Sequence, residues 1–121
     1  MTTPRALNRS FSLDEFAVVL WVLSEMQDRE VASALFHQAC VATVEGGKPT
    51  MLDITVPATI GRSDAVDGPL PVRAVCYDES VGLVGELLIW VSGGFLSGIE
   101  FAWYTDEPPV RLPKPSQLRC E

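Results

Sequence analysis

The chain has 121 residues, of which nine are Lys or Arg and sixteen are Asp or Glu, so its net charge at pH 7 is −7. A chain of this length forms one domain, and a composition that is 47% hydrophobic can bury a core and is not that of a disordered protein. The negative charge repels phosphate groups, which excludes nucleic acid as an expected partner.

The apolar segments indicate where the protein resides. The longest apolar run, Phe16 to Leu23, is far shorter than the roughly 20 residues that a membrane-spanning helix needs. The N-terminal residues before Phe11 contain no apolar stretch of the kind found in secretory signals. We therefore expect a cytoplasmic protein that does not insert into membranes.

The residue types that carry most enzyme chemistry are sparse. Cys40, Cys76 and Cys120 are widely spaced and form no C-x-x-C motif, so we expect free thiols and neither a disulfide framework nor a metal site. His37 is the single histidine, and its position on a predicted helix is more typical of a boundary residue than of a catalytic base. Pro49 stands where a Walker A loop needs Ser or Thr. The sequence thus predicts no metal, no cofactor and no catalytic residue.

Two helices are predicted near the N-terminus. Ser12 and Glu15 have the spacing of a capping box, which starts a helix. The residues that follow, through Met26, are apolar on nearly all sides, so this helix is either buried or binds a partner. Asp28 can cap a second helix that extends through Gln38, and the short break between the two predicts a helical hairpin.

After the helices the hydrophobic period changes to that of β-strands. Five strands are predicted, over residues 40–44, 51–56, 72–78, 84–91 and 95–104. The first two form a hairpin and the last three a meander, because the loops between them are too short for crossover helices. Residues 57–71 form the main loop, residues 1–11 a flexible N-terminus, and residues 106–121 an extended proline-rich tail.

Together these elements predict one α+β domain over residues 1–121. The helical hairpin packs on one face of an antiparallel sheet of about five strands. The proline-rich tail runs over the surface or along a sheet edge, because proline lacks a backbone donor. The second face of the sheet is then available for binding.

The register of the last hairpin decides which side chains face the core. A three-residue loop ending at Gly94 places one apolar set on the core face, namely Leu87, Ile89, Val91, Phe95, Ile99, Phe101 and Trp103. A two-residue turn would move Glu86 and Trp90 to the side of these residues, so the longer loop is favoured. The second face then carries the candidate binding residues, which are Arg73, Tyr77, Glu86, Trp90, Glu100 and Tyr104.

In this register Glu100 lies directly opposite Glu86, with Arg73 as a diagonal neighbour. Side chains opposed in this way have Cβ atoms about 4.5–5.5 Å apart, and like charges there destabilise a sheet. Two interpretations remain open. In one, Arg73 bridges the carboxylates in a solvated acidic patch. In the other, the pair has one raised pKa and receives an Arg or Lys from a partner, or performs acid–base work.

Three segments, residues 85–91, 93–100 and 103–109, together with Leu112 and Pro113, resemble the C-terminal half of small actinobacterial proteins that have no assigned activity. The resemblance is confined to the C-terminal part of the chain. It implies a hairpin and a proline-rich exit from the last strand, and it implies no particular function.

Small size, dispersed negative charge and an aromatic sheet face favour a non-enzymatic protein-interaction module. An immunity or inhibitor-type protein that binds a basic partner fits this description, and the second face also allows a homodimer. The alternative is a small-ligand-binding domain or weak enzyme that uses the face around Glu86 and Glu100, where residues 57–71 and the tail cross it.

Overall fold

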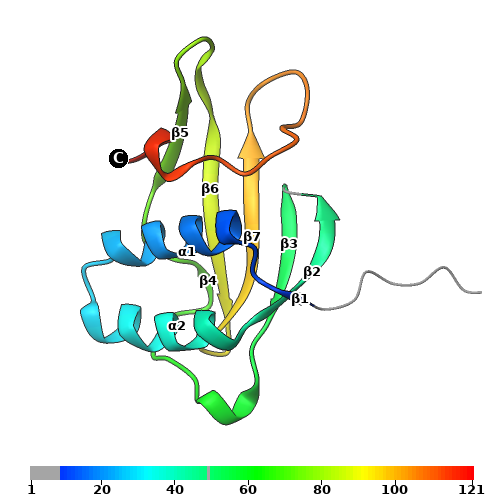
Figure 1. Cartoon of the computed structure of the whole chain (residues 1–121). Helices are drawn as coiled ribbons and strands as arrows, with labels where there is room; N and C mark the ends of the chain where they lie inside the picture. Colours follow the sequence, from blue (N-terminus) through cyan, green and yellow to red (C-terminus); the bar gives the residue numbers. More distant parts are fainter. Residues whose placement is uncertain (1–8, 49) are drawn as a thin grey trace, which may run out of the picture.

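A computed structural model describes residues 9–48 and 50–121, and Figure 1 shows two helices in front of an antiparallel sheet. The helices are α1 (Leu13–Glu25) and α2 (Arg29–Val41). The strands are β1 (Arg9–Ser10), β2 (Thr43–Lys48), β3 (Met51–Thr55), β4 (Gly68–Pro69), β5 (Ala74–Asp78), β6 (Gly82–Ser92), β7 (Phe95–Trp103) and β8 (Leu118–Cys120). The predicted α+β fold is confirmed, but the described sheet has eight strands instead of about five.

Side-chain caps start both helices. The Glu15 amide donates to Ser12 Oγ at 3.2 Å, and the Ser12 amide donates to Glu15 Oε1 at 2.8 Å, which completes the predicted capping box. The Val31 amide donates to the Asp28 carboxylate at 3.1 Å. The predicted starts of both helices, and the hairpin that they form, are therefore confirmed.

The strand order in the sheet is β1-β2-β3-β7-β6-β5-β8, with β4 paired to β6. The predicted hairpin, β2-β3, and the predicted meander, β5-β6-β7, are both present. β3 pairs with β7, which joins the two units. Helix α2 continues to Val41, so Cys40 is helical and does not start a strand; the added helical residues place Ala39 in the core.

Three strands that the sequence does not predict enlarge the sheet. β1 lies in the segment expected to be a flexible N-terminus and pairs with β2, while residues 1–8 of that segment lie outside the described residues. β4 lies in the predicted loop, which also contains a 3-10 turn over Ala58–Ile60. β8 lies in the predicted tail and pairs with β5, and the tail crosses on the helix side of the sheet (Figure 1).

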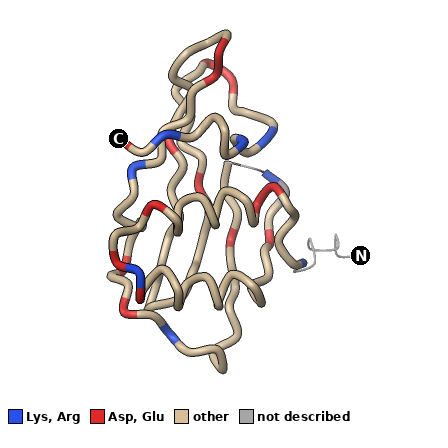
Figure 2. The backbone as a smooth tube through the Cα atoms, turned by 60° about the vertical axis from the view of Figure 1, so that its left-hand side comes forward, with Lys and Arg blue, Asp and Glu red and all other residues tan. Residues whose placement is uncertain are grey.

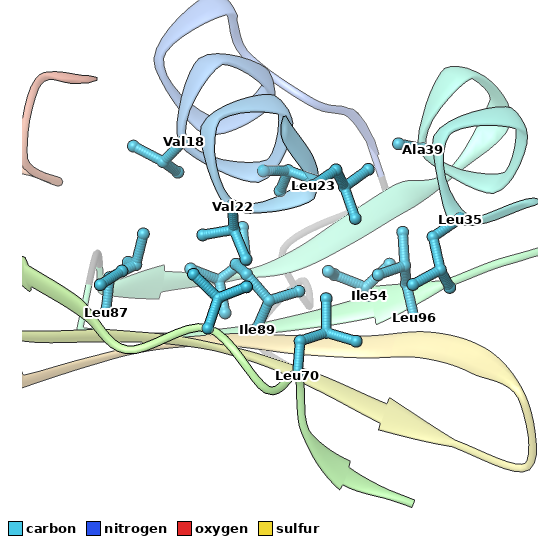
Figure 3. Packing of buried hydrophobic residues seen from close by; sticks show 14 of the residues in the cluster. Val18, Val22, Leu23, Leu35, Ala39, Ile54, Leu70, Leu87, Ile89 and Leu96 are labelled. Carbon is cyan, nitrogen blue, oxygen red and sulfur yellow. The ribbon is translucent and has the colours of Figure 1, made fainter. Parts of the chain in front are cut away.

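The apolar core lies between the helices and one face of the sheet (Figure 3). Val18 and Val22 of α1 and Leu35 of α2 are at most 1% exposed. They pack over alternating residues of the central strands, among them Val44, Ile54, Leu87, Ile89, Val91, Leu96, Ile99 and Phe101. In the described chain no helix covers the opposite face, which we call the outer face (Figure 1).

The turn between β6 and β7 differs from the predicted three-residue loop. Ser92 pairs with Phe95 across a two-residue turn in which Gly93 and Gly94 have φ of 60° and 84°. The register then shifts between Trp90 and Val91, so that β7 carries one extra residue. This β-bulge restores the separation of core and outer residues that an unbulged two-residue turn would have destroyed.

Two residues of β7 that were predicted to lie in the core, Phe95 and Trp103, are not buried there. Leu96 occupies the core at 1% exposure, and Phe95 lies outside the buried cluster. Trp103 is 41% exposed; it is the last residue of β7 and lies opposite Gly85. Most of the predicted core face is nevertheless correct, since Leu87 and Ile99 are fully buried.

A buried glutamine joins three parts of the chain at this turn. Gln38 of α2 is fully buried, and its Nε2 donates to the carbonyl oxygens of Gly94 at 2.9 Å and Gly61 at 3.2 Å. Its Oε1 accepts from the Leu96 amide at 2.9 Å. Ser63 also donates to the Gly94 carbonyl, through its amide at 2.8 Å and its hydroxyl at 2.9 Å. Helix, loop and turn are thus held together by satisfied polar groups.

Two alanine substitutions test this junction, because Gly93 and Gly94 share a positive φ but differ in surroundings. A Cβ at Gly93 meets nothing within 4 Å, so Gly93→Ala should cost only the left-handed backbone term of about 1–2 kcal/mol. A Cβ at Gly94 would lie 2.5 Å from the Ser63 carbonyl oxygen, so Gly94→Ala should cost a further ~1–3 kcal/mol. Urea unfolding measures both, and equal costs would contradict the tight junction.

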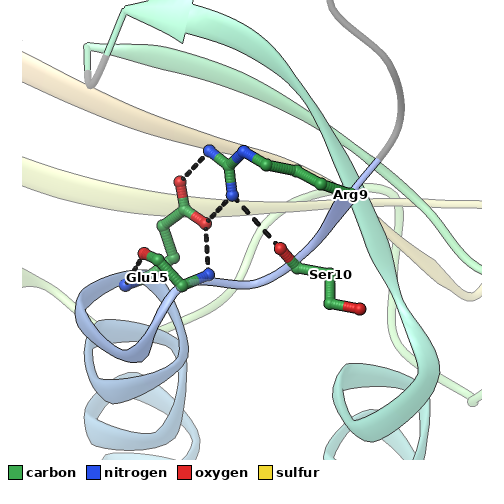
Figure 4. A network of polar contacts seen from close by, with 4 residues as sticks. Arg9, Ser10 and Glu15 are labelled. Carbon is green, nitrogen blue, oxygen red and sulfur yellow. Dashed lines mark hydrogen bonds and ion pairs between the residues drawn. The ribbon is translucent and has the colours of Figure 1, made fainter.

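The first strand is tied to the first helix by an ion pair (Figure 4). Arg9 Nη1 and Nη2 each donate to one carboxylate oxygen of Glu15 at 2.7 Å. Glu15 is only 6% exposed and also accepts from the Ser12 amide. The hydrogen bond from Arg9 is the main reason that the pKa of Glu15 is lowered, and it outweighs the opposing effect of burial.

Acidification should remove the stability that this pair provides. The pKa of Glu15 is lower in the folded state than in the unfolded state, so Glu15 contributes fully to the free energy of unfolding above the usual glutamate pKa of about 4.3. This contribution is lost as the pH falls from there through the lower folded-state pKa. Glu15→Gln should lower the free energy of unfolding at pH 7 by about 1–3 kcal/mol and weaken its pH dependence in acid. Urea unfolding at a series of pH values tests this, with exposed Asp14→Asn as the control. An unchanged acid profile in Glu15→Gln would refute it.

Candidate functional site on the outer face of the sheet

The six predicted binding residues are distributed over three strands and the segments beside them. Glu86 and Trp90 lie on β6, Glu100 on β7 and Tyr77 on β5. Arg73 directly precedes β5, and Tyr104 directly follows β7. Their side chains meet in three separate groups along the outer face, and not at one centre.

Glu86 is the centre of the first group. Tyr104 Oη donates to Glu86 Oε2 at 3.2 Å, and Arg73 Nε lies 3.9 Å from Glu86 Oε1, so the predicted proximity of Arg73 to Glu86 is observed. It follows from the pairing of Val75 with Glu86, which makes Arg73 a diagonal neighbour of Glu86, as predicted. Partial desolvation and the Glu86 carboxylate raise the pKa of Tyr104, which keeps this phenol a donor at neutral pH.

Tyr77 belongs to a second group at the sheet edge. Its Oη donates to Glu121 Oε1 at 3.2 Å, and the Arg119 guanidinium lies over its ring at 4.6 Å from the centroid. Arg119 is placed there by the pairing of β8 with β5. Sequence reasoning missed Arg119 and Glu121 because a three-residue strand inside a proline-rich segment has little signal of its own.

Glu86 and Glu100 do not form the predicted opposed pair. Glu86 lies opposite Ala102, and Glu100 lies opposite Leu88, because the bulge in β7 shifts the pairing by two positions from the predicted one. Both still belong to the outer face. Glu100 instead forms the third group, in which its Oε1 accepts from Trp90 Nε1 at 3.0 Å.

A like-charge pair does occur on this face, between different strands. Glu45 of β2 lies directly opposite Asp53 of β3. β3 in turn pairs with β7, which sets Met51 opposite Glu100 and brings a third carboxylate to the same region. Within the described residues, the ion pairs involve Glu15 and Glu86, and none involves Glu45, Asp53 or Glu100. The alternation of Asp53 with the apolar residues Leu52 and Ile54 could have placed it on the outer face from the sequence alone. Its proximity to Glu100 could not, because it depends on the pairing of β3 with the distant strand β7.

Apolar side chains lie among these charges. Leu88 and Trp90 are half-buried, and Met51 is 52% exposed. Beside β4, a hollow of about 360 Å³ is lined by Pro69, Leu70, Pro71, Val72, Arg73, Glu86, Leu88 and Glu121. The outer face is therefore amphipathic, with a shallow depression at one side.

The histidine of the chain and its buried cysteine both lie away from the outer face. His37 lies on α2 and Cys76 lies in the core, so neither provides a base or nucleophile for the outer carboxylates. Burial raises the pKa of the Cys76 thiol, and Asp78 adds to this, which keeps the thiol neutral and unreactive. In the part of the chain that the structure describes, no three His, Cys, Asp or Glu side chains form a group that could hold a metal ion.

Comparisons of the chain with protein-family models, curated proteins and solved structures found no match. The resemblance of the C-terminal segments to actinobacterial proteins therefore stays a prediction. Neither described helix has the length and apolar character needed to cross a membrane.

The opposed carboxylates lead to a stability prediction. Asp53→Asn removes the repulsion with Glu45, so the free energy of unfolding should rise by about 0.2–1 kcal/mol at low ionic strength. The gain should shrink as salt is added, because salt screens exposed charges. Thermal and urea unfolding provide the measurement, with Asp106→Asn in the exposed tail as a charge-matched control. A loss of stability in Asp53→Asn would show that a cation already compensates the pair.

Proposed function

We propose that this protein is a non-enzymatic interaction module of the immunity or inhibitor type, which acts in the cytoplasm and binds a partner with a basic surface through its outer face. The observation that carries the proposal is a sheet face that neither described helix covers, on which half-buried Leu88 and Trp90 lie among the carboxylates Glu45, Asp53 and Glu100. Aromatic residues surrounded by polar ones dominate the energetics of many protein interfaces.

Trp90 is the expected anchor residue. Its indole is held by the hydrogen bond to Glu100, and it lies opposite Gly98, which has no side chain to compete for the same space. A ring that is already fixed loses little rotamer freedom when a partner covers it. This preorganisation favours binding without a large rearrangement.

The carboxylates select the charge of the partner. Glu45 and Asp53 repel each other in the free protein, so a Lys or Arg side chain placed between them would relieve that repulsion. The net charge of −7 attracts a basic protein over a longer range and speeds encounter. Self-association through the outer face is disfavoured, because a two-fold dimer would bring the same acidic face against itself.

A second candidate function is small-ligand binding or weak catalysis on the same face. The hollow of about 360 Å³ beside β4 favours it, because Arg73 and Glu86 line it together with apolar Leu88. A ligand there would carry both a charge and an apolar group. Binding that survives Trp90→Ala and is lost in Glu86→Gln would favour this candidate over a protein partner.

Affinity purification from the native host, at low and at physiological salt, tests the main proposal. The wild-type bait should recover a basic protein, with less recovered at the higher salt concentration. Trp90→Ala should reduce recovery about tenfold or more, because truncation of a central aromatic typically costs 2 kcal/mol or more. Asp53→Asn combined with Glu100→Gln should also weaken capture.

The matched control is Asp14→Asn combined with Glu25→Gln, which removes the same two charges from exposed positions on α1. It should bind like the wild type if the outer face is the interface. Melting temperatures of all baits establish that they are folded. No partner above background, or equal capture by Trp90→Ala, would refute the proposal.

A further inference from the structure

The two helices carry no charge along most of their length. Residues 16–24 of α1 and 31–41 of α2 contain no Lys, Arg, Asp or Glu, so the charged residues of both helices stand near the helix ends. Figure 2 shows this pattern as an uncharged stretch in each helix, with acidic positions at both ends of α1 and mixed charges at the start of α2. A helix that packs on a sheet with its other side in water normally has charged residues on that side. The solvent side of this helical hairpin does not follow that pattern.

The residues on the solvent side have a heptad spacing in both helices. Positions separated by four, three and four residues share one side of a helix, and this spacing is typical of helix–helix interfaces. None of the residues at these positions is buried. They form what we call the hairpin surface, which consists of Leu13, Ala17, Leu20 and Ser24 of α1 and Arg29, Ser33, Phe36 and Cys40 of α2.

The hairpin surface contains a hollow between the two helices. The hollow measures about 420 Å³ and is lined by Leu20, Leu23, Ser24, Arg29, Ala32, Ser33 and Phe36, so the described residues around it include no carboxylate. Its charged residue, Arg29, donates to the carbonyl oxygens of Leu23 at 3.1 Å and Met26 at 3.0 Å. These bonds satisfy the last carbonyl groups of α1. The guanidinium is thus bound within the chain, and the rest of the hollow suits an apolar group.

Phe36 is an apolar group of the right kind on the same surface. Its side chain is 40% exposed, and the centroid of its ring lies 6.5 Å from that of Phe16, which supports the ring from the side of α1. Phe36 also borders the hollow. One surface therefore offers both an exposed aromatic ring and an apolar hollow, and this self-complementarity is what a two-fold interface requires.

We propose that the hairpin surface is the contact between two copies of this chain, in which Phe36 of each copy enters the hollow of the other and the four helices form a bundle. Charge favours a second copy over a basic partner, because a basic side chain finds no carboxylate in the hollow. The hairpin lies on the opposite side of the sheet from the outer face (Figure 1), so this proposal does not rest on the function proposed for that face.

The size of the hairpin surface sets the strength of the dimer. Each helix has 13 residues, which at roughly 1.5 Å per residue gives a length of about 20 Å, and two helices side by side are about 20 Å wide. Each copy therefore contributes ~400 Å², or ~800 Å² in total, which is below the roughly 1,200 Å² of a standard interface. We expect a reversible dimer with a dissociation constant in the micromolar range or weaker.

Sedimentation equilibrium of the full-length protein, in a reducing buffer that keeps Cys40 as a thiol, tests the proposal. The average mass should rise from that of a monomer toward that of a dimer between about 10 µM and about 1 mM protein. Added salt should strengthen the association or leave it unchanged, because salt screens the repulsion between Asp14, Glu25 and Glu30 of the two copies. A protein that stays monomeric over this range, or a dimer that salt dissociates, would overturn the proposal.

Two variants of the hairpin surface and one matched control locate the interface. Ser33→Glu places a carboxylate at the hollow, and Phe36→Ala removes the exposed ring, so each should weaken the dimer about tenfold or more. Ser33 is exposed, which keeps the test valid if Phe36→Ala lowers stability. Ser92→Glu adds the same charge at the exposed end of β6 and should dimerise like the wild type.

Further measurements separate this surface from the outer face. Melting temperatures establish that the variants are folded. Trp90→Ala should dimerise like the wild type, so failure of the outer-face proposal would not affect this result. Equal association of Ser33→Glu and Ser92→Glu, or a dimer lost in Trp90→Ala and kept in Ser33→Glu, would show that the hairpin surface is not the contact.

Discussion

The register between β6 and β7 is the constraint on which the rest of the structure depends. A two-glycine turn and one extra residue in β7 together set this register. The turn alone would place Trp90 on the same face as the core residues of β7. With the bulge, Leu87 and Ile99 face the helices, and Glu100 faces outward. The apolar core and the amphipathic outer face are therefore two results of the same local irregularity.

The junction at Gln38 holds this register against the helical layer. A side-chain amide that is fully buried is costly unless every polar atom is satisfied, and here both ends of the amide are bonded. Because its partners belong to the turn and to the loop at Gly61, one side chain orients α2, the loop and the β6–β7 hairpin together.

Local signals predicted the helices and the meander, and nonlocal pairing accounts for most of what was missed. The capping box at Ser12 and the alternation along β6 are contained in a few neighbouring residues. Strands of two or three residues, such as β1 and β8, have no period to detect, and they form only because a neighbouring strand offers partners. The same limit applies to the candidate site. The Arg73–Glu86 contact follows from one local hairpin, whereas the Glu45–Asp53–Glu100 group requires the β3–β7 pairing.

The short outermost strands have a consequence for how copies of this protein behave at high concentration. A long, flat strand at a sheet border offers a row of free amide and carbonyl groups to which a second molecule can add. Here the borders are Arg9–Ser10 on one side and Leu118–Cys120 on the other, and each carries an arginine. Within the residues that the structure describes, these border strands have two and three residues, which is too little backbone for a stable intermolecular ladder. In this part of the chain, a sheet face that no helix covers is thus combined with borders that give little support to growth of the sheet into fibrils.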